Sequence, residues 1–116
     1  MQWTEINDRL SGDVTIVDLA GHMTICEAKP VLDKTRQLLD QRRLKILFNL
    51  NGVPYIDSPG LGEIVSSYTM VVRRGGALKL CRVSRRLRAL LETTRLSGVL
   101  EVFDAEEDAV TSFQTA

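Results

Sequence analysis

The sequence predicts a single α/β domain, assigned to residues 1–116, in which helices cover a mixed, mostly parallel β-sheet. Two observations lead to this fold class. Stretches with the apolar spacing of amphipathic helices alternate along the chain with short apolar runs that suit buried strands. Two extended segments separated by the turn residues Ser11, Gly12 and Asp13 precede this alternation and are typical of a β-hairpin. The chain is long enough for one such domain with a sizeable core.

The hairpin is expected over residues 3–21, and the first helix follows it. In the second hairpin strand, the adjacent apolar residues Ile16 and Val17 indicate that the sheet is covered on more than one face. The helix is predicted from one apolar face at i, i+3, i+4 and i+7 spacing, formed by Ala28, Val31, Leu32, Thr35, Leu38 and Leu39. Pro30 then lies in the first turn, where its missing N–H costs little.

Residues 44–50, with the sequence LKILFNL, are expected to form the central strand, because this apolar run is too short for a stable helix. A second helix is predicted from an apolar stripe that spans about 120° at 100° per residue. The stripe comprises Leu61, Ile64, Val65, Tyr68, Val71 and Val72. The consecutive glycines Gly75 and Gly76 end this helix.

The last third of the chain repeats the pattern of strand and helix. A strand is expected over residues 77–83, followed by a helix that Ser84 caps and that buries Leu87, Leu90, Leu91 and Thr94. Residues 99–103 predict a short final strand. The acids within residues 104–108 suit the start of a further helix, where the helix dipole favours negative charge. The sheet should therefore carry right-handed crossovers and about four helices.

Composition limits the function classes. Fifteen basic residues balance fifteen acidic ones, so no nucleic-acid partner is expected, and Arg82, Arg85, Arg86 and Arg88 are interpreted as a solvated helix face. No apolar stretch approaches the roughly 20 residues that cross a bilayer, and no signal peptide opens the chain, so we expect a cytoplasmic protein without membrane insertion. Because His22 is the only histidine, and Cys26 and Cys81 are expected to be reduced, no metal or other cofactor is expected.

The stretch YIDSPGLGEI, residues 55–64, lies where the central strand leads into the second helix. Pro59 fits the first helical position and biases Ser58 toward extended backbone, which predicts that Ser58 is the N-cap. Gly60 and Gly62 leave bare backbone at this helix end. Such a setting suits a phosphate esterified to Ser58, placed among unpaired N–H groups at the positive end of the helix dipole.

This stretch has other possible interpretations. A capping turn alone accounts for a serine before a proline. A nucleotide-binding loop is not indicated, because GxxxxGK[ST] is absent and GLG lacks the spacing of a dinucleotide fingerprint. A serine nucleophile needs a base, and nothing in the sequence places His22 near Ser58, so no enzymatic activity is expected.

The segments VDLAG, ILFNL, YIDSPGLGEIVSSY, RRGGALKLC and LLETTRLSGVLEVF resemble, in this order, the STAS family, the domain shared by sulfate transporters and bacterial anti-sigma factor antagonists. The most specific element is Asp57-Ser58-x-Gly60-Leu61-Gly62. The resemblance implies a STAS-like fold and a regulator that is not an enzyme. It also implies a partner switch in which an anti-sigma factor with serine kinase activity phosphorylates Ser58 and releases the antagonist, and a serine phosphatase restores binding.

The partner-binding surface is expected around the phosphorylated serine, at Asp57, Pro59, Gly60 and Gly62. Helix geometry predicts that the surface continues along an exposed face opposite the apolar stripe, formed by Glu63, Ser66, Ser67, Met70 and Arg74. The loop at residues 21–24 should lie on the same rim, with His22, Met23 and Thr24.

Two alternatives to the partner switch stay open. The first is a STAS scaffold or a subunit of a transport assembly, in which Ser58 is never modified. The second is a sensor that binds a nucleotide or a lipid in a groove by Ser58. Proteins recovered with the chain separate the first alternative from an antagonist, and a thermal-shift panel of nucleotides tests the second.

Overall fold

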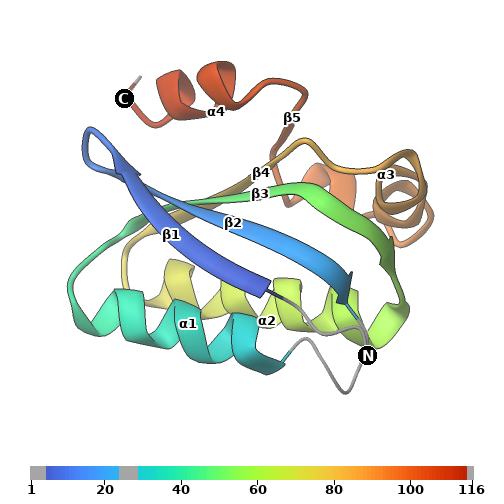
Figure 1. Ribbon diagram of the computed structural model, residues 1–116, viewed down its shortest axis with the longest axis horizontal. Helices are drawn as coiled ribbons and strands as arrows, with labels where there is room; N and C mark the ends of the chain where they lie inside the picture. Colours follow the sequence, from blue (N-terminus) through green and yellow to red (C-terminus); the bar gives the residue numbers. More distant parts are fainter. Residues whose placement is uncertain (1–4, 24–28, 115–116) are drawn as a thin grey trace.

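The computed structural model describes residues 5–23 and 29–114, which form one five-stranded sheet with four α-helices (Figure 1). The strands are β1 (Glu5–Ser11), β2 (Val14–Met23), β3 (Lys45–Ile56), β4 (Ala77–Cys81) and β5 (Val102–Phe103). The helices are α1 (Lys29–Asp40), α2 (Ser58–Arg73), α3 (Arg85–Thr93) and α4 (Glu106–Ser112), with a 3-10 helix at Leu96–Gly98. The strands follow one another in chain order across the sheet, with β1 antiparallel to β2 and the remaining pairs parallel. The predicted fold class and the hairpin are confirmed.

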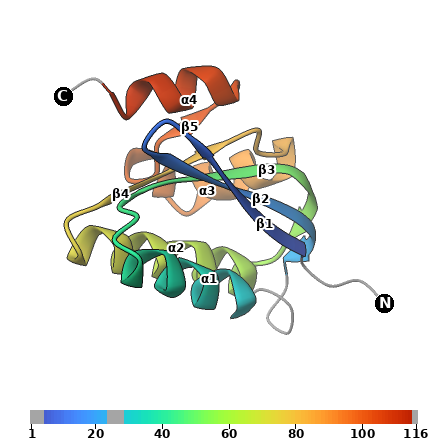
Figure 2. The same cartoon turned by 60° about the vertical axis from the view of Figure 1, so that its left-hand side comes forward.

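Helices cover both faces of the sheet. Figures 1 and 2 show α1 and α2 side by side on one face and α4 on the other, while α3 lies beside the end of β3. Adjacent residues of one strand therefore enter different cores: Val17 joins the larger cluster under α1 and α2, and Ile16 joins the smaller cluster under α4. This arrangement confirms the interpretation of the doubled apolar pair in β2.

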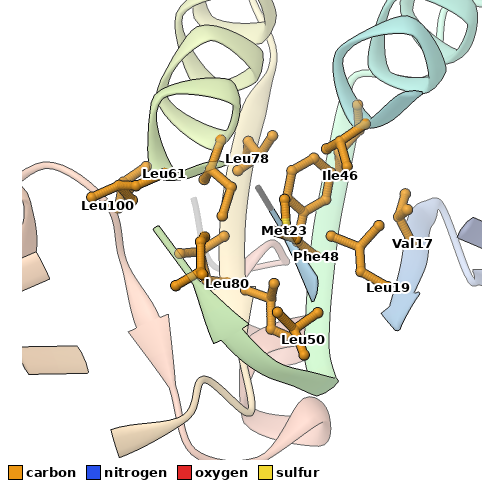
Figure 3. Packing of buried hydrophobic residues seen from close by; sticks show 14 of the residues in the cluster. Val17, Leu19, Met23, Ile46, Phe48, Leu50, Leu61, Leu78, Leu80 and Leu100 are labelled. Atoms are coloured by element: carbon orange, nitrogen blue, oxygen red, sulfur yellow. The ribbon is translucent and has the colours of Figure 1, made fainter. Parts of the chain in front are cut away.

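The larger core is built around the central strand. Phe48 and Leu50 of β3 lie among side chains from the neighbouring strands β2 and β4, such as Leu19 and Leu80 (Figure 3). The smaller core holds Cys81, a free cysteine whose thiol pKa rises to about 11 because the side chain is buried. Cys81 is thus an inert apolar side chain, and Cys26 lies outside the described residues.

Three sequence expectations for these elements were wrong. The central strand does not end at Leu50 but continues to Ile56, because Val53 and Ile56 are also buried and the strand keeps pairing with β2. Only two residues of the predicted last strand pair with β4, and a 3-10 helix precedes them. Thr94, expected to be buried, is exposed as the C-cap of α3.

The buried face of α2 is rotated from the apolar stripe. Val72 is 48% exposed, whereas Ser67, which was expected on the exposed face, is fully buried. The reason is that α2 packs against α1 as well as the sheet, so its buried side lies between these two neighbours and a small serine fits there. The predicted end of the helix is confirmed: it stops before Gly75, which has a φ of 80°.

An ionic cluster attaches α4 to the sheet. Arg9 of β1 donates to Asp18 of β2 at 2.7 and 3.1 Å and also to Glu106 in the first turn of α4. Asn49 of β3 donates to the same Glu106 carboxylate at 2.9 Å. Glu106 therefore ties the start of α4 to two strands beside the smaller core.

Replacing Glu106 by Gln should lower the free energy of unfolding by about 1 kcal/mol near neutral pH, because the pairing with Arg9 is lost. The pKa of Glu106 lies below its usual 4.5, chiefly because Arg9 donates to the carboxylate. This stabilisation is present above the usual pKa and disappears as the pH falls through the folded-state value. Urea unfolding at a series of pH values should show the wild type and Glu106→Gln converging in acid.

The exposed neighbour Glu107 is the matched control, and Glu107→Gln should change stability little at any pH. A Glu106→Gln deficit that stays constant into the acidic range would contradict the assigned role of the carboxylate.

Candidate functional site

The start of α2 is capped by Asp57 and not, as expected, by Ser58. Asp57 has extended backbone angles (φ −106°, ψ 178°), and its Oδ1 accepts a hydrogen bond from the Gly60 N–H at 2.8 Å. The prediction failed because the bias that Pro59 places on the preceding residue does not prevent Ser58 from entering the helix. A carboxylate is also a stronger partner than a hydroxyl for the positive end of the helix dipole.

Ser58 is the first residue of the helix, and its side chain is exposed. The first turn offers few free donors around it: Pro59 has no N–H, Gly60 donates to Asp57, and the Leu61 N–H donates to the Asp57 carbonyl at 2.9 Å. The expected cradle of unpaired N–H groups is therefore smaller than the sequence suggested.

The end of β2 holds this helix start in place. The Asp57 N–H donates to the Met23 carbonyl at 3.2 Å, and a Cβ on Gly60 would lie 2.0 Å from that same oxygen. Only glycine allows this approach. The expectation that Met23 lies on an exposed rim was wrong, because its side chain is fully buried in the larger core. Thr24 lies outside the described residues.

A groove of about 390 Å³ separates the start of α2 from α3. It is lined by Tyr55, Ile56, Asp57, Ser58, Arg86, Ala89, Leu90 and Thr93. The Arg86 guanidinium carbon lies 4.7 Å from the centroid of the Tyr55 ring, a cation–π geometry. On β2, the His22 ring lies 5.6 Å from the same tyrosine ring. Ser58 thus shares its groove with a cationic side chain that the sequence assigned to a solvated face.

Five exposed residues of α2 form one stripe that begins at Ser58. Its members recur about one turn apart and are all exposed: Ser58, Gly62, Ser66, Thr69 and Arg73. A Cβ on Gly62 would meet open space. A second groove, of about 430 Å³, runs along this side of α2 between Val65 and Arg74. We call the five exposed residues named above, from Ser58 to Arg73, the α2 stripe.

The structure brings only part of the predicted partner surface together. Ser58, Pro59, Gly62 and Ser66 are exposed on the first turns of α2, whereas Glu63 and Met70 are half-buried. Met70 packs against the larger core. Gly60, Ser67 and Met23 are buried, so these three leave the candidate surface. Arg74 is exposed and pairs with Asp40 of α1 at 2.9 Å.

Sequence reasoning missed Tyr55 and Arg86. Tyr55 stood within the quoted motif, but its role depends on a partner 31 positions later. No local pattern separates Arg86 from the neighbouring arginines of α3, so nothing in the sequence indicated which of them reaches the groove. Within residues 5–23 and 29–114, no helix is both long and apolar enough to cross a membrane, and no cluster of His, Cys, Asp and Glu could hold a metal ion.

Comparison with known proteins gives concordant matches. The sequence model of the STAS domain matches residues 5–109. The chain is 34% identical over 94 residues to the anti-sigma-B factor antagonist of Bacillus subtilis (strain 168), covering 81% of this chain and 85% of that one. It is similar in structure to an anti-sigma factor antagonist from Mycobacterium paratuberculosis, with a TM-score of 0.84 and 15% identity over 94% of this chain and 92% of that one.

A further structural match is the Bacillus cell fate determinant SpoIIAA, solved in the phosphorylated form. The TM-score is 0.73 and the identity 17%, and the match covers 94% of this chain and 99% of that chain. At these identities, the two structural matches establish the shared fold.

Substituting Asp57 and Ser58 one at a time should show which of the two side chains caps α2. Asp57→Ala should lower the free energy of unfolding by about 0.5–2 kcal/mol, because the Gly60 N–H loses its acceptor. Ser58→Ala should stay within about 0.5 kcal/mol of the wild type, because the exposed hydroxyl does not cap the helix. Urea denaturation followed by circular dichroism measures both. A larger loss for Ser58→Ala than for Asp57→Ala would return the capping role to the serine.

Proposed function

Because this chain belongs to the STAS domain family, we propose that it is an anti-sigma factor antagonist that works as a partner switch. The unphosphorylated form binds an anti-sigma factor with serine kinase activity. Phosphorylation of Ser58 by that kinase makes the antagonist dissociate from the anti-sigma factor, and a serine phosphatase restores binding. The chain thus acts in the cytoplasm as a regulator of transcription and not as an enzyme.

The observation that carries this proposal is the position of Ser58. Its hydroxyl is exposed at the first residue of a helix whose start Asp57 and Gly60 hold against β2. A kinase can therefore reach the hydroxyl without unfolding the helix, because neither the cap nor the close backbone approach involves the serine side chain. SpoIIAA, which shares this fold, has been solved in the phosphorylated form.

Phosphate on Ser58 acts through charge. It adds up to about two negative charges at one end of the α2 stripe, next to the Asp57 carboxylate. A partner surface that packs against the stripe would then face a concentrated negative charge, and binding would weaken through repulsion and desolvation. This switch requires no change of fold.

The α2 stripe is the part of the surface that we assign to partner binding, with Asp57 and Pro59 at its end. Its side chains are small or absent at Gly62 and Ser66, so the stripe presents a low ridge that a partner can approach closely. The groove along Val65 and Met70 borders the same ridge and offers apolar surface beside it. His22 lies near the Ser58 end of the stripe, beside Tyr55.

Ser58 should be the residue that the cognate kinase modifies. Incubation with the anti-sigma factor kinase and ATP, followed by peptide mass spectrometry, should place phosphate on Ser58. Ser58→Ala should bind the kinase permanently, and Ser58→Asp should bind weakly, because its added charge mimics part of the phosphate effect. Binding is measured by calorimetry.

Ser66 and Thr69 provide an internal control, because both hydroxyls are exposed on the same helix. Phosphate found only on these two residues would contradict the assignment of Ser58. Strong binding by Ser58→Asp, with a folded protein, would contradict the charge mechanism while leaving the site in place.

Ser66→Arg should weaken partner binding at least tenfold, about 1.4 kcal/mol, because the long side chain would stand in the middle of the α2 stripe. The thermal midpoint should barely move, since the position is exposed. The matched control is Ser97→Arg, another exposed serine, which lies in the 3-10 helix. Equal affinities for the wild type and Ser66→Arg would remove this part of α2 from the interface.

A further inference from the structure

Arg86 has an unusual setting among the arginines of α3. Its guanidinium lies over the Tyr55 ring, and within the described parts of the chain it forms no ion pair. Arg88, by contrast, pairs with Asp104 at 2.8 Å. A guanidinium on an aromatic face keeps its N–H donors available at its edge. The charge of Arg86 is therefore held in the groove by a ring that leaves its hydrogen-bonding capacity unused.

A phosphate on Ser58 would have few partners within its own helix start. Asp57 places a like charge beside it, Pro59 has no N–H, and the Gly60 N–H already donates to Asp57. Within the groove that Ser58 lines, Arg86 is the one lining residue that carries a positive charge. Guanidinium and phosphate form strong, bidentate hydrogen bonds.

We propose that Arg86 is the intramolecular receiver of the phosphate on Ser58, across the groove between α2 and α3. The inference rests on the proposed phosphorylation of Ser58 and adds to it a specific counter-ion. In the unmodified protein, Tyr55 keeps the guanidinium beside the serine. In the modified protein, the guanidinium binds the phosphate and fixes it against α3, so that the added charge has one position at the end of the α2 stripe.

Binding of the phosphate by Arg86 should change the pKa of the phosphate itself. A phosphoserine normally loses its second proton, and becomes a dianion, near pH 6. Arg86 favours the dianion and should lower this value, whereas the Asp57 carboxylate opposes it. The other titratable groups nearby are Tyr55, beneath the guanidinium, and His22, which lies against the Tyr55 ring. They are present in every variant, so their contributions cancel when variants are compared.

The experiment installs phosphoserine at position 58 by genetic encoding, so that no kinase is needed, and follows its ³¹P resonance as the pH changes. Arg86→Ala should raise the titration midpoint by about half a pH unit or more relative to the wild type. Arg86→Lys should lie between the two, because it keeps the charge but loses the planar fork. Arg85→Ala is the matched control: it removes an exposed arginine one position away that does not line the groove, and should leave the midpoint near the wild-type value.

Equal titration midpoints for the wild type and Arg86→Ala would refute the proposal that Arg86 binds the phosphate. An equal shift in Arg85→Ala would also refute it, because such a shift would indicate only a general charge effect. Neither result would contradict the proposed function, which depends on modification of Ser58 by a kinase and on partner release. Conversely, a kinase that ignores Ser58 would refute the proposed switch while the titration still reports whether Arg86 binds a phosphate at this position.

Discussion

The close contact between the start of α2 and the end of β2 is the constraint on which the site depends. The Met23 carbonyl accepts the Asp57 N–H, and a side chain at position 60 would collide with the same carbonyl. Because the backbone is held there, Asp57 must supply the cap, and the next residue turns outward. The exposure of Ser58 follows from this contact. The geometry that exposes Ser58 is thus provided by buried backbone and not by the serine itself.

The two-sided core makes that constraint rigid. Met23 is anchored in the larger cluster with residues of β3, while α4 and its ionic attachment through Glu106 cover part of the opposite face. Packed interiors resist continuous deformation. A charge added at the surface of such a structure changes what can bind more readily than it changes the fold, which suits a switch that acts by phosphorylation.

Local chemistry accounts for most of the fold that could be predicted. The hairpin turn, Pro30 in the first turn of α1, the Ser84 cap and the glycines after α2 all act within a few residues of their own position. The motif around Ser58 was recognisable for the same reason. The misassigned residues depend on neighbours distant in sequence: Ser67 is buried because α1 lies beside α2.

The sequence by itself determined the order of strands and helices, the two-sided cover of β2 and the position of the candidate serine, because hydrophobic periodicity and turn chemistry are local properties. Only the tertiary structure decided which residue caps α2, which side of that helix is exposed, and that Arg86 lies over Tyr55 in the groove that Ser58 lines. Each of these depends on the distance between segments far apart in the chain, and that distance is set by how the helices pack on the sheet.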